Sequence, residues 1–294
     1  MYILRIMNKI EQLYINKRKE TIDGALVHFK GNKVAESAIE KIFWSSAYAD
    51  NHEEPAFFHP NFSSQKKRLE VLGFDKKDLE VENINNKYLR LQVSSNWILD
   101  LSDFNSFEEY FSLFSKKKRK NLRWLTNTYQ KENFTISKIQ TPEDFELFFE
   151  VYQSQFPKSK WLHCENRKAL KDIFLYFEEQ NINHSFILKD ENGDAIAASL
   201  GYFTGDNLNF YMLARVAGKY DKLSPSNYLA FDIIRNLIEN NHKGLFIFGP
   251  GFYNYKKSFK GSEYPIYRYE KKSLTNILGI IKLYNKQRKL KKEH

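Results

Sequence analysis

The sequence predicts an α/β fold of the α+β type, in which helices flank a mixed, mostly antiparallel sheet. Three observations support this prediction. From about residue 134, short apolar runs alternate with helical patterns; polar turns at 190–194 and 204–207 separate three consecutive apolar runs; and a long helical pattern precedes a last apolar run at 245–248. We therefore expect an antiparallel meander followed by a helix and a parallel strand.

The first 105 residues predict a smaller mixed half. We expect two short strands, Ala25–Phe29 and Val34–Ile39, around a hairpin turn at Gly31. Two further strands are expected at Tyr88–Val93 and Trp97–Leu101.

A basic helical stretch at 106–132 is expected to connect this half to the rest of the chain. Ser106 and Glu109 have the spacing of a capping box, in which each side chain satisfies a free backbone amide of a helix start. Leu122 and Leu125 continue the helical period.

Residues 133–272 form the main predicted domain. Its expected elements, in order, are a strand Phe134–Lys138, a helix from Pro142 with Thr141 as N-cap, a helix after Asn166, strands Ser185–Lys189, Ala195–Phe203 and Leu208–Ala214, a helix opened by Ser224 and Pro225 and closed by Gly244, and a strand Leu245–Phe248. The helix before the last strand makes that strand the expected parallel neighbour of the meander's third strand.

Composition limits the class of protein. With 294 residues, 42% hydrophobic and 16% aromatic, the chain is long and apolar enough for a globular core. Cys164 is the single cysteine, so no internal disulfide forms, and no apolar run approaches the ~20 residues of a spanning helix. We expect a cytoplasmic protein, with the inner face of the membrane as a peripheral alternative.

The net charge of +10 favours phosphate-bearing partners, which are a nucleotide, RNA or an anionic membrane. One basic cluster is 116–120 with Arg123, and another lies in the amphipathic tail 273–294. For the tail we expect a solvated helix face, with peripheral contact to an anionic membrane as the alternative.

One strand-to-helix junction suits an anion. A helix that begins at Ser224 presents unpaired amides and the positive end of its dipole to a ligand. Ser226 and Asn227 add side-chain donors, and Arg215 lies upstream. We expect a pyrophosphate group at this helix start.

Other chemistry leaves fewer signals. No His, Cys, Asp or Glu spacing suggests a metal site, and no phosphate-binding glycine loop is present. His163 lies in a polar segment between two expected helices and has a side chain that titrates near neutrality, so we consider it for substrate contact.

Four features occur in order between Leu113 and Phe259: a basic helix with Arg119, the strand series, the helix opening Ser224-Pro225-Ser226, and a Gly-x-x-x-Tyr-Lys motif made by Gly251, Tyr255 and Lys256. In these features the chain resembles the CelD/BcsL-like acetyltransferase domain, a branch of the GNAT superfamily close to the Fem peptidyltransferases. Ser226 stands where that family usually has glycine, and Ile247 stands where it often has aspartate.

The resemblance implies a GNAT-like sheet, with a degenerate GNAT-like N-terminal half, that opens between the meander's third strand and the following parallel strand. Acetyl-CoA or another acyl-CoA inserts there as donor, and no metal is involved. The strand Tyr211–Ala214, including Leu213, would bind the thioester carbonyl and stabilise the oxyanion. Arg215, Ser224, Ser226 and Asn227 would hold the rest of the donor.

The resemblance also implies roles around the reacting atoms. Lys256 would steady negative charge, and Tyr255 or Tyr211 would protonate the departing thiolate. We also expect His163, Arg119, Gly249 and Gly251 to lie near the acceptor. Several of these residues have structural alternatives: Lys256 as a solvated surface lysine, Tyr211 as a core residue, and the glycines as a bend.

Three functions follow. The first is an acyl-CoA-dependent N- or O-acyltransferase, with acetyl as the favoured group, acting on a sugar, amino-sugar or cell-envelope precursor. The second is a Fem-like aminoacyl or peptidyl transferase that uses aminoacyl-tRNA, whose phosphates the basic helix would contact. The third is a non-catalytic GNAT-fold protein that binds the membrane surface.

Overall fold

A computed structural model describes residues 20–21, 23–44, 68–72, 88–218, 220–250, 254–271 and 281. Its strands are β1 (Arg68–Leu72), β2 (Tyr88–Asp100), β3 (Thr135–Lys138), β4 (Phe186–Lys189), β5 (Ala195–Thr204), β6 (Asn207–Arg215), β7 (Leu245–Pro250) and β8 (Ser262–Lys271). Its helices are α2 (Lys33–Trp44), α4 (Phe107–Ser112), α5 (Lys116–Lys131), α6 (Pro142–Gln155), α7 (Cys164–Glu179), α8 (Pro225–Glu239) and the short α9 (Asn254–Lys257).

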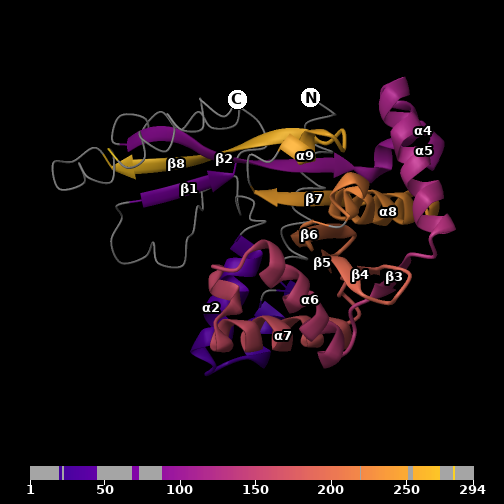
Figure 1. The fold of residues 1–294 in the computed structure, drawn as a ribbon. Helices are drawn as coiled ribbons and strands as arrows, with labels where there is room; N and C mark the ends of the chain where they lie inside the picture. The colour runs from indigo at the N-terminus through magenta and orange to yellow at the C-terminus, as the bar shows by residue number, and fades with distance from the viewer. Residues whose placement is uncertain are drawn as a thin grey trace.

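All eight strands form one sheet in the order β1-β8-β2-β7-β6-β5-β4-β3 (Figure 1). Neighbours are antiparallel except β6 and β7, which are parallel. The predicted mixed, mostly antiparallel sheet with flanking helices is confirmed, and so is the parallel placement of the last strand of the predicted series.

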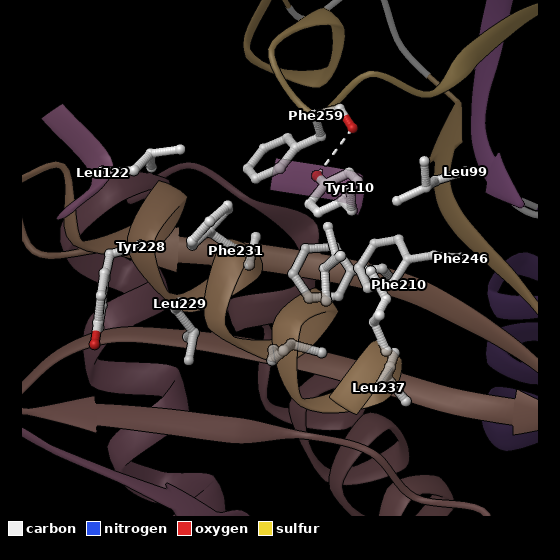
Figure 2. Packing of buried hydrophobic residues seen from close by; sticks show 14 of the residues in the cluster. Leu99, Tyr110, Leu122, Phe210, Tyr228, Leu229, Phe231, Leu237, Phe246 and Phe259 are labelled. Carbon is white, nitrogen blue, oxygen red and sulfur yellow. Dashed lines mark hydrogen bonds between the residues drawn. The ribbon is translucent and has the colours of Figure 1, made fainter. Parts of the chain in front are cut away.

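Two buried clusters hold the helices against this sheet. One contains the apolar sides of α4, α5 and α8, and the other those of α2, α6 and α7. In the first, Phe231 of α8 packs against the rings of Phe107, Tyr110 and Phe111 of α4 (Figure 2). The hydroxyl of Tyr110 donates to the carbonyl oxygen of Phe259 at 3.0 Å, which ties α4 to the chain that follows α9 (Figure 2).

The predicted N-terminal hairpin is wrong. The structure has helical turns at 23–28 and helix α2 where strands Ala25–Phe29 and Val34–Ile39 were expected. Ala35 and Ile39 are buried and lie four residues apart. This spacing places both side chains on one face of a helix, but it would also place them on one face of a strand. Asn32 decides the outcome, because its side-chain oxygen accepts the amide of Ala35 at 3.1 Å and caps the helix.

The five strands from β3 to β7 occur in the predicted order. The two strands expected at Tyr88–Val93 and Trp97–Leu101 are parts of the single strand β2. The expected helical stretch at 106–132 is split into α4 and α5, because Ser106 and Ser115 each cap a separate helix start. The proposed domain division at 105, 132 and 272 stays a prediction, and the tail 273–294 lies outside the described residues apart from Ile281.

Gly244 does not close α8, contrary to the prediction. The helix ends at Glu239, and Asn241 adopts the left-handed conformation that terminates it, with φ 57°. Gly244 has another role, since a Cβ atom there would lie 1.7 Å from the carbonyl oxygen of Asp206. The glycine therefore lets the segment before β7 pass against the β5–β6 turn.

Candidate functional site

Strands β6 and β7 separate soon after they meet. They pair at two positions, Leu208 with Phe246 and Asn209 with Ile247. The register of β6 on β5 then shifts by one residue, which leaves Tyr211 as the extra residue of a bulge. Because a bulge bends its strand and increases its twist, the rest of β6 follows β5 and pairs with no strand on its other side in the described chain.

Lys256 lies where β7 ends, beyond this point of separation. Its Nζ donates to the carbonyl oxygen of Gly249 at 2.8 Å, and the residue is 2% exposed. Burial lowers the pKa of Lys256 to about 7. The alternative of a solvated surface lysine is therefore wrong, and a lysine with this pKa can exchange protons at neutral pH.

Gly249 takes a left-handed conformation, with φ 73°, and the position of a Cβ on it lies 3.7 Å from the carbonyl oxygen of Phe210. It therefore permits the bend that brings the end of β7 back toward α9. Gly251, the other glycine of the predicted site, lies outside the described residues. The buried Ile247 offers no polar group at this strand.

The two candidate tyrosines lie on different sides of the sheet. Tyr211 packs against the rings of Trp161 and Phe174, in the cluster of α6 and α7, and burial raises the pKa of Tyr211 well above its usual value. Tyr255 is half-buried against the cluster of α8, with its ring 6.3 Å from that of Phe259. A raised pKa makes the phenol of Tyr211 a weak proton donor to a thiolate.

The start of α8 is accessible. Ser224 has a left-handed backbone, with φ 48° and ψ 57°, and its side chain forms no cap hydrogen bond. Pro225 is the first helical residue, and Ser226 and Asn227 are half-exposed. An unused cap leaves the first-turn amides and the positive end of the helix dipole to a ligand, as the sequence predicts.

A pocket opens beside this helix start, between α5, α8 and the chain after α9. Its lining residues are Phe114, Lys118, Asn121, Leu122, Leu125, Ser224, Asn227, Tyr228, Phe231, Ser258 and Phe259. Lys118 is half-buried there, burial lowers its pKa, and no carboxylate pairs with it among the described residues. A desolvated cation next to a helix N-terminus favours an anionic ligand.

The sequence did not single out Lys118 or Asn121. A signal was present, because position 118 starts the stripe that continues through Leu122, Leu125 and Tyr129 at helical spacing. A cation on the buried side of an amphipathic helix is unusual and marks a pocket or a partner.

Two predicted donor residues are engaged by protein groups. The guanidinium of Arg215 binds the carboxylate of Asp221, and this contact holds the pKa of Asp221 below its usual value. The backbone amide of Arg215 donates to Oε1 of Gln155 at 2.8 Å. Leu213 is half-buried against the α8 cluster, so its side chain packs rather than binds polar groups.

Two predicted acceptor residues have structural contacts. Arg119 donates to the carbonyl oxygens of Ser112 at 3.0 Å and Phe114 at 2.6 Å, which satisfies free acceptors at the end of α4. His163 is exposed at the N-cap position of α7, where its carbonyl accepts the amide of Arg167. Roles of Arg119 and His163 in acceptor binding stay predictions.

Asn96 of β2 was missed by the sequence reasoning. It lies opposite Pro250, at a shift of the β2–β7 register, and is 1% exposed. Within the described part of the chain, neither its side-chain nitrogen nor its side-chain oxygen has a hydrogen-bond partner. The signal was weak, because Asn96 follows two serines and directly precedes the apolar run that begins at Trp97, so the sequence alone does not indicate that it is buried.

The described residues hold neither a cluster of metal-binding side chains nor a helix that could span a membrane. They contain no group of three or more His, Cys, Asp or Glu side chains arranged for a metal ion. Within the same residues, no helix has the length and hydropathy needed to cross a bilayer.

Residues 114–257 match the family model of the acetyltransferase (GNAT) domain. Among solved structures, FemX has a TM-score of 0.52 at 11% identity and is similar over 72% of this chain and 74% of that one. L-PGS from Bacillus licheniformis has a TM-score of 0.49 at 16% identity, over 74% of this chain and 72% of that one. No curated protein matches the chain. At this identity, the similarity to FemX shows a shared fold.

Proposed function

We propose that this chain, an acyltransferase with a GNAT domain at residues 114–257, transfers an acyl group from CoA to an amine or hydroxyl. Acetyl-CoA is the first donor to test. The resemblance to the CelD/BcsL-like branch favours a sugar, an amino-sugar or a cell-envelope precursor as acceptor. The observation that carries the proposal is the separation of β6 from β7 beside the open start of α8.

The donor would lie along this separation. Its thioester arm would lie along the free edge of β6 beyond Asn209, and its phosphates would meet Ser224, Ser226 and Asn227. Lys118 supplies a cation on the other wall of the pocket. The departure from glycine at Ser226 adds a hydroxyl donor at this place.

Acyl transfer would follow in balanced steps. The acceptor nitrogen or oxygen attacks the thioester carbonyl carbon, the carbon–sulfur bond breaks, the acceptor loses a proton and the thiolate gains one. Backbone amides on the free edge of β6 would stabilise the oxyanion, and one such donor typically lowers the barrier by about 3 kcal/mol.

Lys256 would carry the proton. With a pKa of about 7 it is substantially neutral at neutral pH, so its amine can accept the proton of the acceptor. The resulting ammonium is a stronger acid than a thiol, whose pKa is about 8.5, so proton transfer to the thiolate is favourable. Tyr255 is the alternative donor, and the raised pKa of Tyr211 disfavours it for this step.

The test is acyl transfer and direct binding with acetyl-CoA and longer acyl-CoAs, in the absence of RNA, on a panel of amino-sugars. Asn227→Asp places a negative charge at the start of α8 and should raise the KM for acyl-CoA about tenfold or more. Asn240→Asp, at the exposed other end of α8, is the matched control and should leave KM near the wild-type value. Absence of binding and turnover with every acyl-CoA would remove the proposal.

The alternative donor is aminoacyl-tRNA, as the resemblance to the Fem enzymes implies. Its supporting observation is the row of cations on α5. RNA-independent turnover of acyl-CoA separates the two donors, and steep salt-dependent binding of tRNA without acyl-CoA turnover would favour the alternative. Retained ligand binding without turnover of either donor would favour a non-catalytic GNAT-fold protein.

A further inference from the structure

Helix α5 has a strongly basic outer face. The helix contains seven lysines and arginines and no acidic residue. Two of the seven turn toward the protein, since Lys118 lines the pocket and Arg119 binds backbone carbonyls. The other five are exposed: Lys116, Lys117, Lys120, Arg123 and Lys131.

An aromatic side chain lies among these cations. Trp124 is 50% exposed, although a side chain of this size is usually well buried. At about 100° per residue, Lys116, Lys120 and Trp124 point away from the buried stripe of Leu122 and Leu125. Figure 1 shows α4 and α5 at one edge of the fold, with α8 on their inner side.

Among the residues that the structure describes, none of the five exposed cations forms an ion pair with a carboxylate. The guanidinium of Arg123 lies over the ring of Phe111, 5.1 Å from its centroid, and this contact leaves its charge in place. Lys116 and Lys120 lie four residues apart, a spacing at which like charges destabilise a helix. An external polyanion would relieve this repulsion.

We propose that the outer face of α5, defined by Lys116, Lys120, Arg123, Trp124 and Lys131, docks on an anionic lipid bilayer. Lysine and arginine bind anionic headgroups, and a tryptophan ring favours the interface between headgroups and acyl chains. The surface is a single convex helix, which suits a flat partner.

RNA fits this surface less well. The major groove of an A-form helix is too deep and narrow for protein side chains to read, and single strands bind in grooves with several stacking aromatic residues. The outer face of α5 offers one tryptophan on a ridge. The inference goes beyond acyl transfer and does not depend on it.

The test is co-sedimentation of the full chain with vesicles of phosphatidylcholine, alone or mixed with anionic phosphatidylglycerol. Each cation near an anionic surface strengthens partitioning about fivefold, so the double variant Lys116→Glu/Lys120→Glu should lose at least tenfold. Trp124→Ala should lose severalfold. The matched control is the double variant Lys158→Glu/Lys168→Glu. Both lysines are exposed; Lys158 lies before α7 and Lys168 lies in it. Vesicle binding of this control should stay within about twofold of that of the wild type.

The wild type is expected to bind anionic vesicles, to bind neutral ones weakly, and to release with added salt. Circular dichroism confirms that each variant is folded. The proposal is overturned if the wild type does not bind anionic vesicles, or if the α5 double variant binds as well as its control. It is also overturned if the wild type binds tRNA but not vesicles and the α5 double variant loses this binding to tRNA.

Discussion

Replacing Lys256 by methionine should stabilise the protein and abolish its turnover. The pKa of Lys256 is about 7 in the folded chain, against a usual value of 10.5. Between these pH values the unfolded chain binds more protons, so the free energy of unfolding rises with pH across this window. At about 1.4 kcal/mol per pKa unit, burial of this lysine costs the folded state about 5 kcal/mol at pH values below 7.

Methionine has a similar volume and no charge to desolvate. It loses the hydrogen bond to the carbonyl oxygen of Gly249, about 1 kcal/mol, so the net gain near pH 6.5 is about 4 kcal/mol. Urea unfolding at pH 6.5 and pH 9 measures this gain. Between these pH values the free energy of unfolding should rise by about 2–3 kcal/mol more in the wild type than in the variant.

Other groups should not obscure this difference. Burial also raises the pKa of Tyr110 and Tyr129, but both titrate above the range of the assay and are common to both proteins. Turnover of acyl-CoA should fall at least a hundredfold in the variant, because the amine that accepts the acceptor's proton is lost. A less stable variant, a difference independent of pH, or retained turnover would each refute this account of Lys256.

Three further predictions concern the pocket, a close backbone approach and a buried amide. Lys118→Met should raise the KM for acyl-CoA about tenfold at unchanged kcat, whereas Lys120→Met on the outer side of α5 should not; equal effects would remove Lys118 from the donor site. Gly244→Ala should lower the free energy of unfolding by about 3 kcal/mol or more, because its Cβ meets the backbone of the β5–β6 turn. Gly193→Ala is the control, because Gly193 has φ 85° but open space around it, and it should lower the free energy of unfolding by about 1 kcal/mol in chemical denaturation. Similar losses for Gly244→Ala and Gly193→Ala would contradict the steric explanation. Asn96→Leu should raise the free energy of unfolding by about 1–2 kcal/mol, and a decrease would show that the buried amide has a partner such as water.

The central strands could be predicted because their signals are local. Apolar runs between Asx- and Gly-containing turns delimit β4, β5 and β6, and Ser224-Pro225 marks the start of α8. The same kind of signal failed at Gly31, where an apolar run, a polar turn and a second apolar run fitted two helical segments as well as a hairpin. Local pattern does not decide between these periods when the runs are short.

Strands β1 and β8 could not be predicted, because their pairing joins distant parts of the chain. Arg68 pairs with Glu270, and β8 contains Pro265, which argues against a strand when sequence alone is read. The burial of Lys256 and of Asn96 was hidden for a related reason. Whether Lys256 or Asn96 is exposed to solvent depends on how β2, β7 and α9 pack together. The residues next to each of them in the sequence do not indicate this packing.

A crystal structure of the protein with bound CoA would show whether the donor occupies the opening between β6 and β7. We expect the sulfur end of CoA beside the free edge of β6, near Tyr211 and Gly249, and the pyrophosphate at Ser224 and Asn227. Bound CoA elsewhere on the protein, or β6 and β7 paired along their full length in the complex, would contradict this expectation.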